Sequence, residues 1–246
     1  MKKIVVAPDS FKGSLTSAEV ADAVERGIKD VFPQCNVVKA GVADGGEGTV
    51  EAIVKAVGGD MYAASVTDPL GRPVKAAYGI VRSGGVKTAV MEMSAASGLP
   101  LLLPDELNPW ITSTYGTGEM ISDALNRGCR KFLVGIGGSA TNDAGTGMLS
   151  ALGVRFLDSS GQRLKGCGRD LESIARIDMS SLMPAARESE FIVACDVNTL
   201  FCGPDGAARV FAPQKGADPQ TAEALDRGMR SFAQVIAGQF QTDIVP

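Results

Sequence analysis

Residues 131–147 have the sequence KFLVGIGGSATNDAGTG, which is the strongest indication of the fold class. Its first six residues form a short apolar run, typical of a strand that is buried on both faces. A glycine-rich loop follows at once, and a short helix is expected to run from it to Leu152. A buried strand that leads through a loop into a helix indicates an α/β fold with a parallel sheet.

The same order of strand, loop and helix is predicted twice before residue 60. The apolar run KIVVAP at residues 3–8 predicts a strand, and a helix is expected to begin at Thr16, where Glu19 completes a capping box. A second strand is predicted around residues 37–42. It is followed by the loop 44–48 and by a helix from about Thr49 that two glycines end.

The pattern changes after Asp60. Three strands are predicted, MYAASVT, VKAAYGIV and KTAVMEM, at residues 61–67, 74–81 and 87–93. The turns between them are too short to hold a helix, so these strands should be antiparallel and a domain boundary is expected near residue 60. Further predicted elements are a helix at 119–126, strands at 154–158 and 190–195, and a helix from about 219 to 240.

The composition excludes several kinds of chemistry. The 246 residues include no histidine, which removes Ser-His and Cys-His nucleophile pairs, histidine metal ligands and histidine proton shuttles. Acid–base chemistry must therefore use Asp, Glu, Lys, Tyr or Cys. The net charge of −4 argues against nucleic acid as a partner.

The cysteines and the hydropathy pattern indicate where the protein works. The five cysteines are odd in number, widely spread and without metal-site spacing, so reduced thiols are expected. The N-terminal apolar run is too short for a signal peptide, and no run approaches the ~20 apolar residues of a membrane span. We expect a cytoplasmic protein that does not associate with membranes.

Three loops with one design follow predicted strands. Residues 9–13, 44–48 and 137–143 each combine glycine with polar or acidic side chains, and Asp196 follows the apolar strand EFIVAC. Ligands of open α/β sheets bind at the carboxyl ends of the strands, where helix N-termini offer N–H groups to anions such as phosphate. The alternative for each single loop is a tight turn with a helix cap.

A dinucleotide fingerprint is a rival interpretation. Residues 135–140 fit GxGxxA directly after a strand, and Asp158 ends the next strand about 20 residues later. The first alternative is therefore a Rossmann-type NAD-dependent oxidoreductase. Against it, the loop continues to Asp143, and a carboxylate among the N–H groups is unfavourable beside a pyrophosphate unless a metal intervenes.

Taken together, the loop sequences resemble the type-1 glycerate kinase family. The resemblance covers almost the whole chain in order. It lies in APDSFKGSL (7–15), VADGGEGT (42–49), DPLGRPV (68–74), ASGL (96–99), GTGE (116–119), GIGGSATNDAGTG (135–147), ACDV (194–197), GPDGAA (203–208) and PQKGA (213–217). It implies ATP-dependent phosphorylation of D-glycerate, and hence a phosphotransferase with an alcohol group as acceptor.

The resemblance also implies a two-domain architecture. Residues 1–60 would be the N-terminal part of a flavodoxin-like or Rossmann-like domain, and residues 61–246 an inserted mixed α/β domain. Family members continue beyond the equivalent of Pro246 to complete the first domain, so residues 1–60 are expected to lack sheet partners here. An inactive ligand-binding remnant is the alternative if the chain ends at residue 246. A local departure is Asn198-Thr199-Leu200, where many members have Asn-Pro-Leu.

The chemistry of phosphoryl transfer suggests a role for each polar residue of the loops. Without histidine, Asp9 or Asp196 is expected to accept the hydroxyl proton. Lys12 is expected to meet the glycerate carboxylate or the transferring phosphoryl group, with Ser10 and Arg72 as further substrate-binding residues. Asp9 could instead be a cap, Lys12 a solvated loop residue, and Arg72 a partner of Asp68.

The nucleotide and its metal are assigned to the remaining loop residues. The predicted nucleotide-binding residues belong to the glycine-rich loop: Gly137, Gly138, Ser139, Thr141 and Asn142. Asp44 and Asp143 are predicted to bind Mg²⁺, because hard cations prefer carboxylates, although Asp44 could instead be a helix cap. The sequence leaves open whether the 2- or the 3-hydroxyl is the acceptor, which carboxylate is base or metal ligand, and whether the protein is a homo-oligomer.

Overall fold

The computed structural model describes residues 3–8, 11, 14–15, 17–40 and 48–244. Four residues with predicted roles, Asp9, Ser10, Lys12 and Asp44, lie outside the described residues, and so does the predicted helix cap Thr16.

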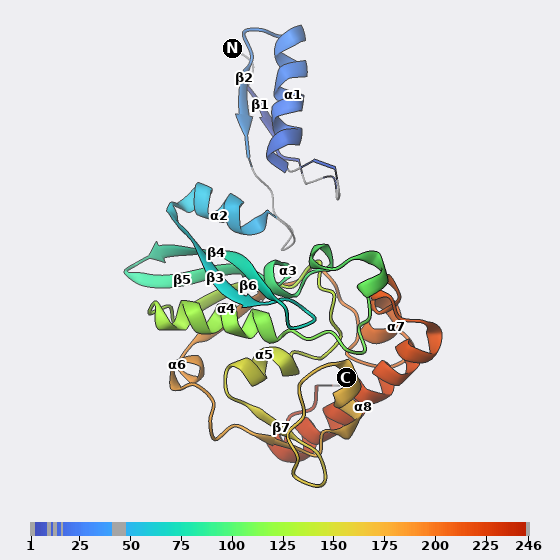
Figure 1. Ribbon diagram of the computed structural model, residues 1–246. Coiled ribbons are helices and arrows are strands. Elements are labelled where there is room, and N and C mark those ends of the chain that lie inside the picture. Colours follow the sequence, from blue (N-terminus) through green and yellow to red (C-terminus); the bar gives the residue numbers. More distant parts are fainter. Residues whose placement is uncertain (1–2, 9–10, 12–13, 16, 41–47, 245–246) are drawn as a thin grey trace.

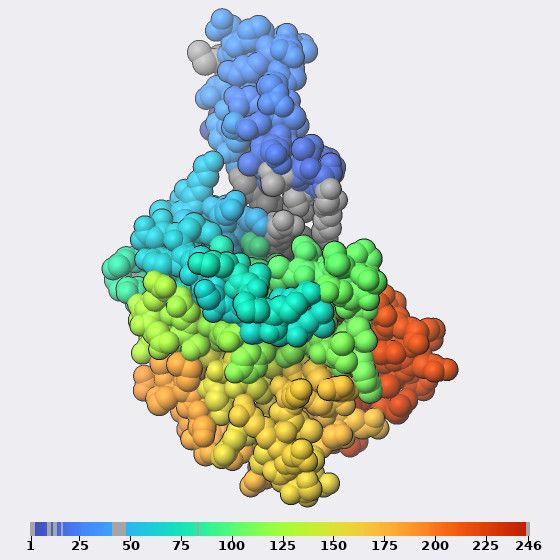
Figure 2. Space-filling view, in the orientation of Figure 1, coloured from blue at the N-terminus to red at the C-terminus, as the bar shows by residue number. Residues whose placement is uncertain are grey.

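The N-terminal unit is a strand, a helix and a second strand. Strands β1 (Lys3–Val6) and β2 (Asn36–Lys39) form a two-stranded parallel sheet, and α1 (Ser17–Val31) connects them. Helix α1 buries Val20 and Ala21. This unit projects from the rest of the molecule in Figures 1 and 2. The two strands and the helix predicted for residues 3–40 are confirmed.

A five-stranded mixed sheet forms the centre of the molecule. Its order is β3 (Gly59–Thr67), β4 (Pro73–Ser83), β5 (Val86–Glu92), β6 (Lys131–Gly135) and β9 (Glu190–Ala194). Strands β3, β4 and β5 are antiparallel neighbours, as the short turns predicted, whereas β6 and β9 run parallel to β5. The parallel half of the sheet therefore brings the carboxyl ends of three strands to one edge.

Helices cover both faces of this sheet. Helix α2 (Thr49–Val57) lies on one face and α4 (Tyr115–Asn126) on the other (Figure 1). Along β5 the side chains alternate accordingly, since Ala89 and Met91 belong to the core under α4 and Val90 to the smaller core under α2. Because α2 packs on strands that follow residue 60, side-chain packing links the two sides of the predicted domain boundary.

A glycine allows α2 to approach the sheet. A Cβ atom on Gly79 of β4 would lie 2.3 Å from Cγ2 of Val54. Glycines also allow α4 to pack closely, because a Cβ on Gly116 would lie 1.8 Å from the carbonyl oxygen of Thr67. Residues 116–119 are therefore not the turn that their glycines suggest in the sequence. They lie in the first turns of α4, which begins at Tyr115 rather than at Glu119.

The remaining elements form a second core beside the sheet. Helix α8 (Pro219–Phe240) follows its predicted bounds, and its stripe packs Leu225, Met229 and Phe232 against residues that include Phe156. The other elements are α3 (Ser94–Ser97), η1 (Leu99–Leu101), η2 (Pro104–Glu106), α5 (Thr146–Ala151), β7 (Arg155–Leu157), η3 (Gly168–Ser173), β8 (Arg176–Asp178), α6 (Pro184–Arg187), α7 (Ala207–Phe211) and η4 (Pro213–Lys215).

The position of β7 contradicts the dinucleotide fingerprint. That motif needs the strand after the glycine-rich loop to lie in the same parallel sheet. Strand β7 instead pairs antiparallel with β8 in a separate two-stranded sheet. Asp158, the expected ribose ligand, accepts hydrogen bonds from Ser160 and Gln162 in its own turn.

Among the described residues, no helix is both long and apolar enough to cross a membrane.

Candidate functional site

A cavity of about 1260 Å³ opens at the carboxyl edge of the parallel strands. Glu92 at the end of β5, Gly137 after β6 and Asp196 after β9 all line it. The position agrees with the rule that open α/β sheets bind ligands at this edge. The volume suffices for a ligand of nucleotide size.

The glycine-rich loop forms one wall of the cavity and is held by the segment after β5. The N–H of Leu99 donates to the carbonyl of Gly138, and the N–H of Ala140 donates to the carbonyl of Ser97, both at 2.9 Å. Gly138 has a φ of +71°, a conformation that favours glycine. The ASGL and GIGGSA segments therefore build one rigid wall together.

Asp143 closes the base of this loop as a buried carboxylate. Its Oδ2 accepts hydrogen bonds from the N–H and the hydroxyl of Thr114, at 2.8 and 2.7 Å, and from the N–H of Gly147 at 3.2 Å. Its Oδ1 accepts the N–H of Gly145 at 3.1 Å. Burial raises the pKa of the Asp143 carboxyl, and the surrounding donors act in the opposite direction. Asp143 thus connects α4 to the start of α5.

The described residues form no preassembled Mg²⁺ site. Among them, no group of three or more acidic, cysteine or histidine side chains could hold a metal. Both oxygens of Asp143 face N–H or O–H donors, which is the opposite of what a cation needs. The metal roles of Asp143 and of Asp44 stay predictions, and the geometry around Asp143 does not support the first.

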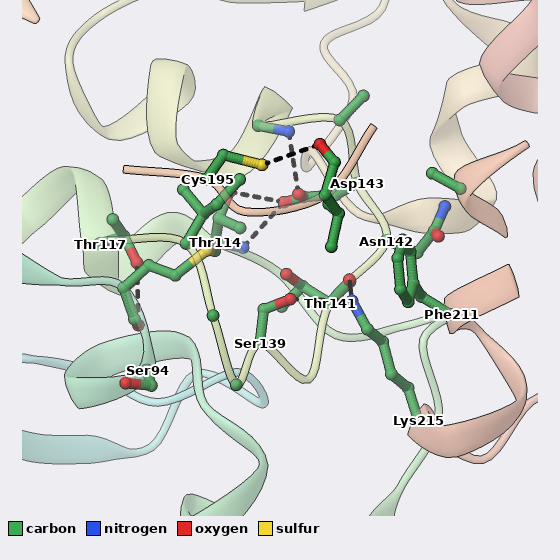
Figure 3. A pocket seen from close by; sticks show the side chains of 18 of the residues that line it. Ser94, Thr114, Thr117, Ser139, Thr141, Asn142, Asp143, Cys195, Phe211 and Lys215 are labelled. Atoms are coloured by element: carbon green, nitrogen blue, oxygen red, sulfur yellow. Dashed lines mark hydrogen bonds between the residues drawn. The ribbon is translucent and has the colours of Figure 1, made fainter. Parts of the chain in front are cut away.

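Lys215, the last residue of η4, is a pocket residue to which the sequence assigned no role. Its side chain is 8% exposed, and Nζ donates to Oγ of Ser139 at 2.8 Å and to the carbonyl of Thr141 at 2.6 Å. Figure 3 shows the side chain reaching from below the loop to these two residues. Burial lowers the pKa of the ammonium group to about 8, and the charge of Asp143 opposes that shift.

The predicted nucleotide-binding residues meet at the cavity. Gly137, Gly138, Ser139, Thr141 and Asn142 all line it. The Nδ2 of Asn142 points at Sδ of Met229 in α8, at 3.3 Å, so this amide is partly turned into the second core. Hydroxyl groups that the sequence did not single out, those of Ser94, Thr114 and Thr117, add to the polar lining (Figure 3).

Two carboxylates at this edge of the sheet differ in their accessibility to a ligand. Asp196 is exposed and lines the cavity just after β9. Glu92 is buried, and its Oε1 accepts the N–H of Val50 in the first turn of α2 at 2.9 Å. Asp196 is therefore the carboxylate that a ligand can reach, whereas Glu92 caps a helix.

Arg72 lies outside this constellation. Its Nε contacts Oδ2 of Asp68 and its Nη1 contacts Oε1 of Glu106, both at 2.6 Å. These two carboxylates raise the pKa of the guanidinium group further above its ordinary value. Arg72 is not among the residues that line the cavity. Its pairing with Asp68, the structural alternative, is what the structure shows, and its substrate-binding role stays a prediction.

These features define the class of protein. The chain has an α/β fold with a glycine-lined cavity at the carboxyl ends of parallel strands, a reachable carboxylate and a buried ammonium group. The model of the glycerate kinase family matches residues 4–245, and the chain belongs to this family.

Relatives and a solved structure agree with that assignment. The chain is 50% identical over 233 residues to a glycerate kinase of Haemophilus influenzae, a match that covers 95% of this chain and 61% of the relative. It is 46% identical to a glycerate 2-kinase of Escherichia coli K12, with coverage of 98% and 63%. A crystal structure assigned as a glycerate kinase 2 of Salmonella typhimurium LT2 matches with a TM-score of 0.85 at 45% identity, over 99% of this chain and 65% of that chain.

The chain thus spans less than two thirds of the length of these relatives. The Rossmann-type oxidoreductase is not favoured, because both the sheet topology and the family argue against it.

Proposed function

We propose that this protein phosphorylates D-glycerate with ATP as the phosphoryl donor. The observation that carries the proposal is the cavity at the ends of β5, β6 and β9, lined by loops whose sequences match the glycerate kinase family. Two relatives that are 50% and 46% identical to this chain over the aligned residues are named glycerate kinase and glycerate 2-kinase.

The glycine-rich loop is proposed to receive the phosphate groups of ATP. Gly137, Gly138, Ser139, Thr141 and Asn142 line the cavity, and the two glycines leave room for a ligand to approach the backbone. The hydroxyl groups of Ser139 and Thr141 supply donors of the kind that bind phosphate oxygens. The rigid pairing of this loop with residues 97–99 holds these groups in place before the ligand arrives.

Asp196 is proposed to accept the proton of the attacking hydroxyl group. It is exposed at the cavity wall, and without histidine a carboxylate is the remaining group suited to this step. Asp9, Ser10 and Lys12 remain proposed catalytic and substrate-binding residues outside the described part of the chain, with Lys12 expected to stabilise the transferred charge. A cytoplasmic location is part of the same proposal.

The test is turnover of D-glycerate with ATP, followed by ³¹P NMR. The expected result is a phosphoglycerate signal, whose shift and coupling show whether the 2- or the 3-hydroxyl is phosphorylated. Asp196→Asn is expected to lower kcat/KM at least ~100-fold, the usual contribution of general-base catalysis.

Asp205→Asn serves as the matched control, because Asp205 is also an exposed carboxylate in the same part of the chain but does not line the cavity. An Asp196→Asn variant as active as this control would remove Asp196 from the mechanism. No phosphoglycerate at all would contradict the proposed function.

A further inference from the structure

The ammonium group of Lys215 is buried in contact with neutral atoms. Its described hydrogen-bond partners are the hydroxyl of Ser139 and the carbonyl of Thr141. In the described part of the chain, no carboxylate oxygen lies within 4.0 Å of its Nζ as an ion pair. In every ion pair among the described residues, the lysine or arginine side chain is at least 40% exposed.

Such an arrangement is costly without a compensating charge. Removing an ammonium group from water carries an effective penalty of several kcal/mol, and hydrogen bonds to neutral oxygens offset only part of it. A neutral hydrogen-bonding side chain could link η4 to the glycine-rich loop with a smaller desolvation penalty. The charge itself therefore needs an explanation.

The cavity supplies one. Lys215 lines it, as do both residues to which its Nζ donates. An ammonium group has three N–H donors, and the two described bonds leave one of them for a ligand. Phe211, labelled in Figure 3, lines the same cavity.

We propose that Lys215, with Ser139, forms a subsite for an oxyanion of the ligand. The inference rests on the proposed function, because it assigns part of the same cavity. An oxyanion in this cavity has two sources, a phosphate group of the nucleotide and the carboxylate of the acceptor. Either one would place a negative charge in direct contact with the buried ammonium group, a contact that no described carboxylate makes.

The experiment is isothermal titration calorimetry with pyrophosphate, D-glycerate and ATP, without added metal and at constant ionic strength. Wild type is compared with Lys215→Met, which keeps an unbranched apolar stem and removes the charge. Lys131→Met is the matched control. It removes the same charge from an exposed ion pair with Glu190 outside the cavity.

The subsite predicts that Lys215→Met weakens binding of one probe at least ~10-fold, the effect of one charge-assisted hydrogen bond, while Lys131→Met does not. Loss confined to pyrophosphate and ATP assigns the subsite to phosphate, and loss confined to D-glycerate assigns it to the carboxylate. Equal affinities of wild type and Lys215→Met for all probes would overturn the subsite and leave the proposed function standing. A wild type that binds neither ATP nor D-glycerate would contradict the proposed function as well.

A second measurement needs no variant. Crystals of the wild-type chain soaked in tungstate are expected to show anomalous density in contact with Nζ of Lys215. Tungstate bound elsewhere, with none at Nζ, would overturn the subsite even if Lys215→Met fails to fold.

Discussion

Replacement of Asp143 tests how the glycine-rich loop is held. The carboxylate receives four hydrogen bonds from three residues, two from Thr114 and one each from Gly145 and Gly147. In Asp143→Ala the hydroxyl of Thr114 can rotate to another acceptor, but its backbone N–H cannot. The first N–H groups of α5 lose their acceptor in the same change.

The size of the effect follows from these orphaned donors. Each buried donor left without an acceptor costs about 1–3 kcal/mol, and the removal of a buried charge returns part of that energy. We therefore expect Asp143→Ala to lower the free energy of unfolding by about 3–5 kcal/mol. Asp143→Asn should cost about 1–3 kcal/mol, because its carbonyl can keep the bonds of Oδ2 while its amide faces the N–H of Gly145.

The assay is urea unfolding followed by circular dichroism, with equal slopes required for comparison. Asp205→Asn, an exposed carboxylate, is the control and should stay within about 0.5 kcal/mol of wild type. An Asp143→Ala variant with the unfolding midpoint of the control would refute the role of this carboxylate as the link between α4 and α5.

Three shorter predictions concern other parts of the chain. Because burial lowers the pKa of Lys215 to about 8, the unfolded chain binds more protons than the folded chain between pH 8 and pH 10.5. As the pH rises through this range, the free energy of unfolding of wild type should increase by up to about 3 kcal/mol relative to Lys215→Met, measured by urea unfolding at each pH. A difference that stays constant with pH would contradict the lowered pKa. Gly79→Ala should lower the free energy of unfolding by about 1–3 kcal/mol, since its Cβ would lie 2.3 Å from Cγ2 of Val54. Gly27→Ala, at an open position in α1, should raise it by about 0.5–1 kcal/mol. Equal effects of the two substitutions would refute the close packing of α2. Strand β9 is an edge strand of the five-stranded sheet, and its Ile192 is 52% exposed. We therefore expect the 246-residue chain to self-associate, as measured by light scattering, and Ile192→Lys to reduce the self-association. An unchanged degree of association in Ile192→Lys would exclude the β9 edge as the contact.

The strands were predictable because their signal is local. The runs KIVVAP, KFLVGI and EFIVAC are apolar and end at turn residues, which suffices to place β1, β6 and β9 within a few residues. The start of α4 was missed, because Gly116 and Gly118 suggest a turn when their neighbours are unknown. Their contacts with Thr67 and Met148, distant in sequence, require glycine inside a helix.

The candidate site was predictable by position and less so by role. Parallel strands bring residues 137–143 and Asp196 to one edge, and this follows from the order of elements. The role of Asp143 depends on Thr114, which lies 29 residues away and gave no signal of its own. Lys215 belongs to the PQKGA motif, but nothing local shows that its ammonium group is buried against Thr141.

ATP and D-glycerate are proposed to meet in the cavity at the ends of β5, β6 and β9. A crystal structure of the chain with D-glycerate and a non-hydrolysable ATP analogue tests it most directly. We expect the triphosphate to lie against residues 137–142 and Lys215, with the glycerate hydroxyl facing the side of Asp196. Ligands bound at another surface, with this cavity occupied only by solvent, would contradict it.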